Sequence, residues 1–247
     1  MKTIMITGTS SGYGLETARH FLERGWRVIA TMRTPRQDVL PRSEQLRVLA
    51  LDVTDARSIA AAVDAAGPVD VLVNNAGIGA FGAFEATPMQ TTREIFETNT
   101  FGTMAVTQAF VPGFRQRRSG VIVNVTSSAT LAAFPLVAPY TASKTAVQGF
   151  TASLALELRP FNVRVRLIEP GYGPETRFTE NGGARMQGLI TEPYAAYAQD
   201  VFAQFAQATS VTHASDVADA VWQAANDTSQ RLHYPAGADA LALAAGG

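Results

Sequence analysis

Short and almost continuously apolar runs alternate with longer amphipathic segments along this chain, and that alternation restricts the possible folds more than any other feature. The apolar runs cover residues 3–7, 27–31, 47–51, 69–73, 121–125 and 163–168. A strand that helices cover on both faces is apolar along its whole length, because neither face meets water. The alternation therefore predicts repeated βαβ units that build one parallel, doubly wound sheet.

The segments between these runs carry the helical spacing of apolar residues. They predict helices over 12–23, 56–66, 91–117 and 140–158, and a last weak strand over 232–234. No repeat, linker or change of composition divides the 247 residues, so we expect a single α/β domain over 1–247. Residues from about 172 to 212 carry no strand signal and become amphipathic again near 192–207, which predicts a substrate lid.

Composition excludes several classes of function. The net charge is -1 and the Lys and Arg residues are scattered, which argues against nucleic acid as a partner. The chain has no cysteine, and its three histidines, His20, His213 and His233, lack ligand spacing, so we expect no metal site. The apolar run at the N-terminus is too short for a signal peptide and no run approaches membrane-spanning length, which predicts a cytoplasmic protein without membrane contact.

A glycine-rich turn, Thr7 to Gly14, follows the first apolar run and opens the first helix. Gly8 allows a tight turn, Gly12 lets backbone amides approach a pyrophosphate, and Gly14 allows close packing of the helix on the sheet. The spacing is GxxxGxG and departs from the general GxGxxG fingerprint. Three glycines can also form a plain tight connection, but the position at the first βα turn favours a nucleotide site.

Tyr140 and Lys144 stand at i and i+4 of a predicted helix. An ammonium on the same helix face can stabilise a phenolate, which a free tyrosine with a pKa near ~10 scarcely forms at neutral pH. The alternative is an ordinary pair on a solvated face. Ser127 follows the strand predicted over 121–125, and this places Ser127 and Tyr140 at the carboxyl edge of the sheet, where open α/β folds bind ligands.

Six motifs together resemble the short-length branch of the short-chain dehydrogenase/reductase family, in family order and spacing from Lys2 to about Gly171. They are Thr7 to Gly14, Asn74-Asn75-Ala76-Gly77, Asn99-Thr100-Phe101-Gly102, Ser127, Tyr140 with Lys144, and Pro170-Gly171. The resemblance implies a Rossmann-like fold in three layers, a nicotinamide cofactor, no metal, and oxidoreduction between an alcohol and a carbonyl compound.

The resemblance also implies roles for individual residues. Tyr140 corresponds to the general acid/base, Lys144 to the group that lowers the pKa of Tyr140 and holds the nicotinamide ribose, and Ser127 to the hydroxyl that orients the substrate. Ser128 is the competing serine. Asn99 corresponds to the residue that passes protons towards the lysine with water. The implied cofactor contacts, besides Tyr140 and Lys144, are Gly8, Ser10, Ser11, Gly12, Tyr13, Gly14, Arg33, Asp52, Val53, Asn75, Ala76, Gly77, Pro170, Gly171 and Thr176.

Two positions bear on the choice and grip of the cofactor. Met32 stands where family members that prefer NAD(H) usually have Asp, and Arg33 offers a fork suited to a 2′-phosphate, so we expect NADP(H) rather than NAD(H). Arg33 could also be a plain surface residue. Glu175 occupies the position of the threonine that clamps the nicotinamide carboxamide, and we expect Thr176 to take that role by a shift of one residue. Asp52 matches the carboxylate at the adenine, or else caps the helix that follows.

The expected substrate pocket is apolar, which predicts a lipophilic ketone, aldehyde or secondary alcohol. Its candidate residues, each of which could instead be core, are Leu131, Phe134, Leu136, Val137, Tyr172, Phe178, Met186 and Leu189. Arg177 and Arg185 could bind an acidic substrate or remain solvated. Residues 231–239 resemble the ending of NADP-dependent members that act on lipophilic carbonyls.

Two other functions compete with this reading. A noncatalytic NADP(H)-sensing protein would keep the glycine turn but could lose Tyr140 or Lys144. A sugar-nucleotide epimerase or dehydratase would need a larger C-terminal substrate domain. The resemblance further implies a homodimer or homotetramer that forms through the two long helices starting at Thr91 and Tyr140.

Overall fold

The computed structural model describes residues 1–176 and 178–246, and it confirms the parallel, doubly wound sheet. The strand order is β3-β2-β1-β4-β5-β6-β7, with every pairing parallel. The chain builds outward from β1 to β3 and then returns to place β4 on the other side of β1, so the order reverses between β1 and β4. The strands are β1 Thr3–Thr7, β2 Arg27–Met32, β3 Leu46–Ala50, β4 Val71–Asn74, β5 Gly120–Val125, β6 Val163–Pro170 and β7 His233–Ala236.

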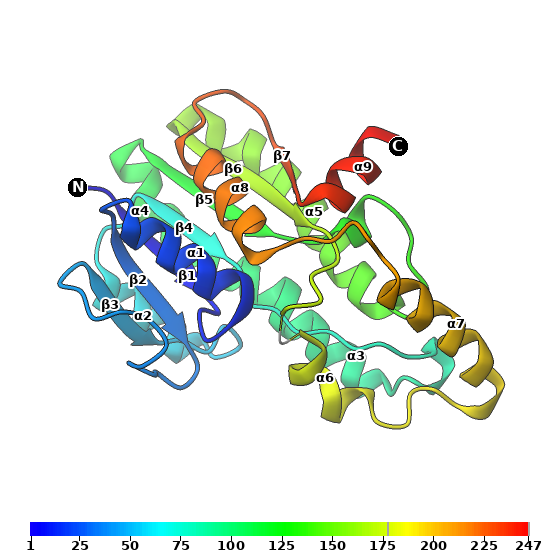
Figure 1. Cartoon of the computed structure of the whole chain (residues 1–247). Coiled ribbons are helices and arrows are strands. Elements are labelled where there is room, and N and C mark those ends of the chain that lie inside the picture. Colours follow the sequence, from blue (N-terminus) through cyan, green and yellow to red (C-terminus); the bar gives the residue numbers. More distant parts are fainter. Residues whose placement is uncertain (177, 247) are drawn as a thin grey trace.

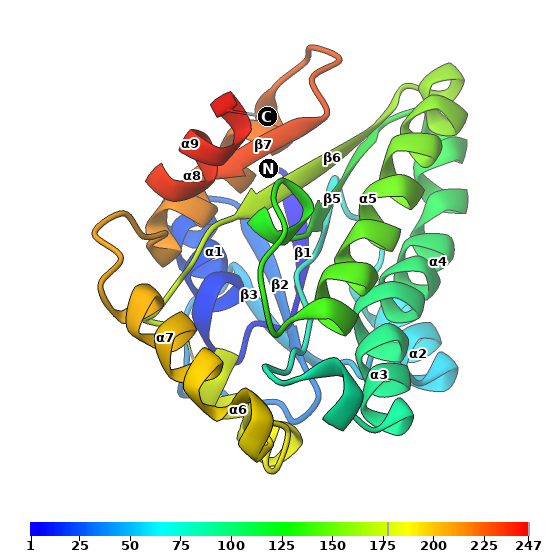
Figure 2. The ribbon, with the colours of Figure 1, turned by 90° about the vertical axis from the view of Figure 1, so that its right-hand side faces the viewer.

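Helices cover both faces of the sheet. In Figure 1, α1 and α8 lie on one face while α2, α4 and α5 lie on the other, and α6 and α7 extend beyond the carboxyl ends of the strands. Figure 2 looks towards those ends, with α6 and α7 on one side and α3, α4 and α5 on the other. The helices are α1 Gly12–Glu23, α2 Ala56–Ala66, α3 Met89–Phe96, α4 Gly102–Arg117, α5 Ala138–Leu158, α6 Phe178–Met186, α7 Ala195–Ala206, α8 Ala214–Asn226 and α9 Ala238–Gly246.

The core consists of two apolar layers, one on each face of the sheet. Successive residues of β1 alternate between them: Ile4 and Ile6 belong to the layer under α1 and α8, and Met5 belongs to the layer under α2, α4 and α5. All three side chains are fully buried. This two-sided burial is the reason that the strands read as continuous apolar runs.

The helix predicted over 91–117 is not continuous. It divides into α3, a π-helical turn over Glu97–Phe101, and α4. Asn99 lies in the π turn with its side chain fully buried, and the amide nitrogen Nδ2 donates to the backbone oxygen of Ile78 at 2.8 Å. Thr100 Oγ1 donates to the backbone oxygen of Ser143 at 3.0 Å. These contacts to two other segments hold the extra residue that widens the helix at this point.

Three helices were not predicted: α6, α8 and α9. The buried residues of α8 are four alanines and two valines, and this face of the helix packs on α1. The amphipathic pattern near 192–207 is confirmed as a short 3₁₀ turn over Glu192–Tyr194 followed by α7. Within residues 1–176 and 178–246, no helix has the length and apolar character required to cross a membrane.

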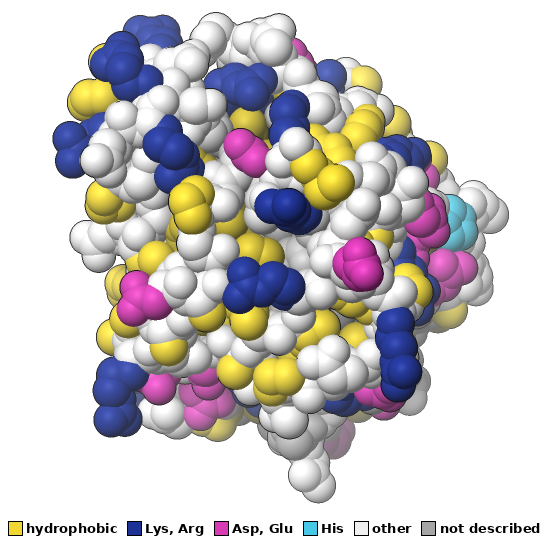
Figure 3. All heavy atoms as spheres, turned by 90° about the vertical axis from the view of Figure 1, so that its left-hand side faces the viewer, with side chains coloured by type: hydrophobic (Ala, Val, Ile, Leu, Met, Phe, Trp, Pro, Cys, Tyr) yellow, Lys and Arg dark blue, Asp and Glu magenta, His cyan; other side chains and the backbone are white. Residues whose placement is uncertain are grey.

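The surface carries no concentrated charge on the side away from α6 and α7. Figure 3 shows that Lys and Arg side chains are dispersed over this face among acidic, apolar and uncharged side chains. This distribution matches the scattered basic residues of the sequence. A phosphate backbone would therefore meet no basic stripe here.

Buried side-chain hydrogen bonds link the middle of the sheet to two helices. Asn74 Nδ2 donates to Asn124 Oδ1 and to Thr107 Oγ1, both at 2.8 Å, and Asn124 Nδ2 donates to Thr151 Oγ1 at 2.8 Å. The four residues belong to β4, β5, α4 and α5, and Asn124 is fully buried. The network fixes these helices against the strands whose ends carry the predicted site.

We expect Asn124→Ala to lower the free energy of unfolding by about 2–4 kcal/mol, because it leaves Asn74 and Thr151 buried without this partner. Urea denaturation monitored by circular dichroism measures the change. The control is Asn226→Ala at the exposed end of α8, which should change the free energy of unfolding by less than about 0.5 kcal/mol. Equal effects of the two substitutions would contradict a stabilising role for the network.

Candidate active site

A cavity of about 1500 Å³ opens at the carboxyl ends of the central strands. Most of the site residues predicted from the sequence line it, although they come from loops far apart in the chain. Of the predicted residues, Gly14, Asn99 and Lys144 lie behind the cavity wall. The lining ones are Gly8, Ser10, Ser11, Gly12, Tyr13, Arg33, Asp52, Val53, Asn75, Ala76, Gly77, Ser127, Tyr140, Pro170, Gly171 and Thr176.

The glycine-rich turn has the backbone shape that a dinucleotide requires. Gly8 and Gly12 adopt φ values of 72° and 57°, which other residues rarely take. A Cβ atom added at Gly14 would collide with the side-chain nitrogen of Asn75 and the backbone oxygen of Gly8. Among the described residues, no side chain caps the N-terminus of α1 at Ser11. The first amides of the helix are thus available to an anion such as a pyrophosphate.

The segment after β4 braces this turn through hydrogen bonds to Thr7 and Gly8. The backbone nitrogens of Asn75 and Ala76 donate to Thr7 Oγ1 at 3.0 Å each. Asn75 Nδ2 donates to the backbone oxygens of Thr7 and Gly8 at 3.0 and 3.1 Å. Thr7 was not predicted as a functional residue, and its hydroxyl is the acceptor that joins the two loops.

One end of the cavity combines an acid with a base. Asp52 Oδ1 accepts hydrogen bonds from the nitrogen and hydroxyl of Thr54 at 2.9 and 2.8 Å, and these bonds hold the pKa of the carboxyl below its usual value, with a smaller contribution from Arg33. The alternative that Asp52 caps the following helix is wrong, because Asp55 is the N-cap of α2. Arg33 is exposed and lines the cavity at the end of β2.

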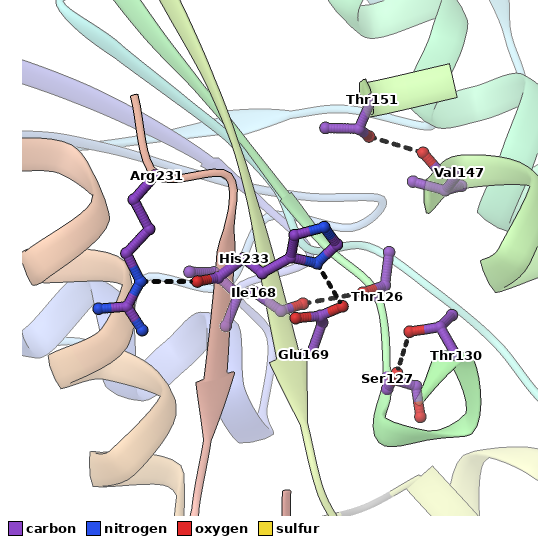
Figure 4. Close-up of polar contacts among 9 residues, drawn as sticks. All are labelled: Thr126, Ser127, Thr130, Val147, Thr151, Ile168, Glu169, Arg231 and His233. Atoms are coloured by element: carbon purple, nitrogen blue, oxygen red, sulfur yellow. Dashed lines mark hydrogen bonds and ion pairs between the residues drawn. The ribbon is translucent and has the colours of Figure 1, made fainter. Parts of the chain in front are cut away.

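The side-chain hydroxyls of Ser127 and Tyr140 meet at the other end of the cavity. The side chain of Ser127 hydrogen-bonds the phenol of Tyr140, which selects Ser127 over Ser128 as the residue beside the phenol. Ser127 is held in turn by its own loop: its Oγ accepts from the nitrogen of Ala129 at 3.2 Å, and its backbone oxygen accepts from Thr130 Oγ1 at 2.7 Å (Figure 4). The loop after β5 and the first turn of α5 therefore present the two hydroxyls on one wall.

The relation between Tyr140 and Lys144 differs from the prediction. Burial raises the pKa of the Tyr140 phenol, and the hydrogen bond with Ser127 opposes this only in part. Lys144 Nζ lies 6.0 Å from the centre of the Tyr140 ring and donates to the backbone oxygen of Val125 at 2.9 Å. The resemblance implies that Lys144 lowers the pKa of Tyr140, but in this structure the pKa of the phenol is raised and the Lys144 ammonium is directed to a carbonyl. Burial also lowers the pKa of Lys144 to about 8.

Asn99 and Lys144 lie directly beneath the cavity wall. A Cβ atom added at Gly77 would stand 3.3 Å from both Asn99 Oδ1 and Lys144 Nζ. Asn99 Nδ2 also donates to Ser143 Oγ at 3.0 Å, and Ser143 Oγ donates to the backbone oxygen of Tyr140 at 2.7 Å. Ser143 was missed in the sequence, although its position between Tyr140 and Lys144 was a signal. Ser143 joins the π turn to α5, the helix that carries Tyr140 and Lys144.

Glu175 and Thr176 have different surroundings. Thr176 lines the cavity near Gly12, and its hydroxyl donates to the backbone oxygen of Gly173 at 2.8 Å. Glu175 is exposed and pairs with His213, with 3.3 Å between Oε2 and Nδ1. The carboxylate therefore points away from the proposed phosphate site, where its charge would be unfavourable.

Aromatic rings surround the part of the cavity next to the loop before Tyr140. Phe205 of α7 is central, with its ring centre 5.1 Å from Tyr172, 6.3 Å from Phe134 and 6.4 Å from Phe81. Phe134 and Tyr172 were predicted as pocket residues and line the cavity, as does Val137. Phe81 and Phe205 were missed, since only the tertiary contact of four separate segments brings the rings together.

Other pocket predictions are not supported. Leu189 is 3% exposed and packs in a small core with Ala80 and Ile95, against which Met186 also packs. Leu131 and Leu136 are not among the described residues that line the cavity. Arg177 lies outside the described residues, as does the side chain of Phe178, whereas Arg185 lines the cavity.

Two carboxylates hold the strand end that carries Pro170 and Gly171. Glu169 is fully buried, and its Oε1 lies 3.0 Å from Nδ1 of His233 on the neighbouring strand β7 (Figure 4). Asp239 in α9 accepts from the backbone nitrogen of Tyr172 at 2.6 Å. Neither acid was predicted, because each is linked to this loop by the tertiary fold and not by nearby sequence.

With this geometry in view, comparison with known proteins identifies the family. Residues 2–187 match the model of the short chain dehydrogenase family, and the chain belongs to that family. It is 43% identical over 181 residues to the uncharacterized oxidoreductase YusZ of Bacillus subtilis, covering 69% of this chain and 64% of that one. It is 38% identical over 182 residues to a 3-ketodihydrosphingosine reductase of Bacteroides thetaiotaomicron, covering 72% of this chain and 66% of that one. The chain thus matches slightly less than two thirds of the length of these relatives.

Solved structures agree with the fold. A short-chain dehydrogenase from Streptomyces avermitilis superposes with a TM-score of 0.83 at 33% identity, covering 100% of this chain and 92% of that one. A family member from Burkholderia phymatum in complex with NAD gives 0.83 at 25% identity, covering 99% and 92%. A dehydrogenase from Burkholderia cenocepacia in complex with NADP gives 0.79 at 26%, covering 100% and 94%. A nicotinamide cofactor is therefore supported, and the glycine turn has the shape to receive it.

The buried Lys144 ammonium should make stability depend on pH in a defined window. Its pKa rises from about 8 in the folded protein to its ordinary value of 10.5 on unfolding, so between these values the unfolded chain binds more protons and stability increases with pH. We expect Lys144→Met to be more stable than the native protein at pH 7 and this advantage to be about 2 kcal/mol smaller at pH 9.5. Urea denaturation at both pH values measures it.

The matched control is Lys2→Met, which changes the only other lysine in the sequence, an exposed one. Its difference from the native protein should stay constant between the two pH values. A constant difference for Lys144→Met as well would show that the Lys144 ammonium is not destabilised in the folded protein.

Proposed function

We propose that the protein transfers a hydride between NADP(H) and a hydrophobic ketone, aldehyde or secondary alcohol, with Tyr140 as the general acid/base. The observation that carries this proposal is the hydrogen-bonded pair of Ser127 and Tyr140 on the wall of the cavity that the glycine turn also lines. Proton donors and a nucleotide cradle in one cavity are the parts that carbonyl reduction needs.

In this mechanism the bound nicotinamide supplies or accepts the hydride. Negative charge then develops on the substrate oxygen, where Ser127 polarises the carbonyl group and Tyr140 delivers the proton. Because burial raises the pKa of Tyr140, the phenol is protonated at neutral pH and is suited to act as the acid of carbonyl reduction. Lys144, whose pKa is lowered to about 8 and whose Nζ lies 6.0 Å from the centre of the Tyr140 ring, is the cation that we propose restores the proton, and Asn99 holds the helix turn beside it.

NADP(H) is our choice of cofactor because the end of β2 carries a base and no acid. Met32 is buried at 3% exposure, and the exposed guanidinium of Arg33 is directed to the cavity. A 2′-phosphate would meet the guanidinium group of Arg33 here, whereas a free ribose hydroxyl would find no carboxylate on this strand end.

The substrate we propose is lipophilic. An apolar wall next to Tyr140 is formed by the rings of Phe81, Phe134, Tyr172 and Phe205. We propose that residues 172–212, which include α7, form a lid on the substrate pocket. The name of the Bacteroides relative specifies a long-chain ketone as its substrate, which agrees with an apolar pocket. We also propose a homodimer or homotetramer through α4 and α5, where Leu156 is 64% exposed.

The rival function is a noncatalytic NADP(H) sensor on the same fold. A sensor requires the glycine turn and Arg33 but has no use for a buried phenol bonded to a serine. Burying Tyr140 and Lys144 is unfavourable for their charged forms, and such groups concentrate at catalytic sites. The catalytic proposal therefore accounts for more of the structure.

Tyr140→Phe tests the proton donor. We expect kcat for NADPH-dependent ketone reduction to fall at least about 10³-fold, since general acid catalysis is lost, while the dissociation constant for NADPH changes less than about twofold. The control is Tyr197→Phe, which removes an exposed hydroxyl from α7 and should leave both constants unchanged. Turnover by Tyr140→Phe at the native rate would refute the assignment, and a native protein that binds NADPH but reduces no member of a ketone and aldehyde panel would favour the sensor.

Arg33→Ala tests the cofactor preference. Loss of a charge-assisted contact to the 2′-phosphate should raise the KM for NADPH about 10- to 100-fold and leave the KM for NADH nearly unchanged. Steady-state kinetics with each cofactor provides the measurement, and Arg42→Ala, at an exposed arginine of the same connection, serves as the control. If both KM values remain at their native level, Arg33 is a surface residue.

A further inference from the structure

Tyr13 places a phenol between the nucleotide turn and the loop that leaves β6. The residue lies in the first turn of α1, and its ring packs against the apolar layer under α1 and α8. Its hydroxyl lies against Gly173: a Cβ atom added at that glycine would overlap the Tyr13 oxygen. The absence of a side chain at Gly173 therefore provides the space for the phenol, which lines the cavity.

The Tyr13 hydroxyl is an unused hydrogen-bond donor. Within residues 1–176 and 178–246, the phenol oxygen has no hydrogen-bond partner. The other hydroxyl beside Gly173 belongs to Thr176, and it already donates to the backbone oxygen of Gly173 at 2.8 Å. Thr176, which the sequence suggested as the clamp for the carboxamide, has thus used its proton inside the protein, and Tyr13 has not.

The charges around the phenol indicate which kind of acceptor it suits. Burial raises the pKa of Tyr13 well above its ordinary range, and the acidic groups of Tyr140, Asp239 and Asp216 add to the effect. The phenol therefore remains protonated and acts as a donor. The same carboxylates disfavour an anion beside the hydroxyl, so a phosphate is a poor partner there and a neutral carbonyl oxygen is a good one.

We propose that the Tyr13 hydroxyl donates a hydrogen bond to the carboxamide oxygen of the nicotinamide and so sets the position of the ring relative to Tyr140. The proposal rests on the function proposed above. Tyr13 belongs to the turn that receives the nucleotide, and its hydroxyl reaches the end of the cavity where the proposed acid stands. A neutral carboxamide is the part of the cofactor that matches this donor and its acidic surroundings.

Comparing the dissociation constants of two nucleotides distinguishes this contact from a general effect on binding. The two are NADPH and 2′-phospho-ADP-ribose, which lacks the nicotinamide. For Tyr13→Phe we expect the dissociation constant for NADPH to rise about five- to tenfold, the equivalent of one neutral hydrogen bond, and that for 2′-phospho-ADP-ribose to stay within about twofold. Isothermal titration calorimetry on the whole protein measures both without turnover. Circular dichroism and the Tm verify that the variant is folded.

Gly173→Ala provides a second test that leaves Tyr13 in place. Its methyl group would displace the phenol, so it should weaken NADPH binding selectively in the same way. Tyr197→Phe serves again as the control and should change neither constant. Tyr13→Phe that weakens both nucleotides equally, or neither, would overturn the proposed contact while leaving the proposed function intact. A native protein that binds neither NADPH nor NADH would overturn both proposals.

Discussion

Burial of both faces of the parallel sheet is the constraint on which the rest of this structure depends. Ile4 and Ile6 fill one apolar layer while Met5 fills the other, so the faces of the central strands offer little room for a polar site. The polar chemistry is confined to the carboxyl ends of the strands. There the reversal of strand order between β1 and β4 opens a cavity, and the loops that follow each strand from β1 to β6 contribute to its lining.

The loops at this edge are held by buried hydrogen bonds that lie behind the residues lining the cavity. Thr7 accepts hydrogen bonds from backbone amides of the loop after β4, and Asn99 donates to the backbone oxygen of Ile78. Ser143 links Asn99 to the helix of Tyr140 by hydrogen bonds. Each of these contacts fixes a residue that lines the cavity, although Thr7, Asn99 and Ser143 do not line it themselves. The π turn between α3 and α4 contributes to these contacts, because this local departure from α-helical geometry places Asn99 where it can form them.

The site also opposes folding at some positions. The buried Lys144 ammonium and the half-buried Tyr140 phenol are each destabilised in their charged forms, and Tyr140 lines the cavity while Lys144 lies behind its wall. Such an arrangement is expected where a proton must be held and released in a water-poor pocket. The buried network of Asn74, Asn124, Thr107 and Thr151 stabilises the same strands and helices from below.

The sequence alone predicted the alternation of strands and helices and most of the candidate residues that line the cavity, because strand burial, helix periodicity and motif spacing are local properties. The glycine turn, the 74–77 segment and the Ser127–Tyr140 pair could all be read in this way. Only the tertiary structure decided that Lys144 turns to the Val125 carbonyl, that Glu175 points away from the cavity, and that Phe205 joins Phe81. The direction in which a side chain points and the residues that it contacts depend on packing between segments distant in the chain, and no local sequence pattern encodes them. The position of the Tyr13 hydroxyl beside Gly173 was likewise decided by the tertiary structure, because the two residues belong to segments that are distant in the chain.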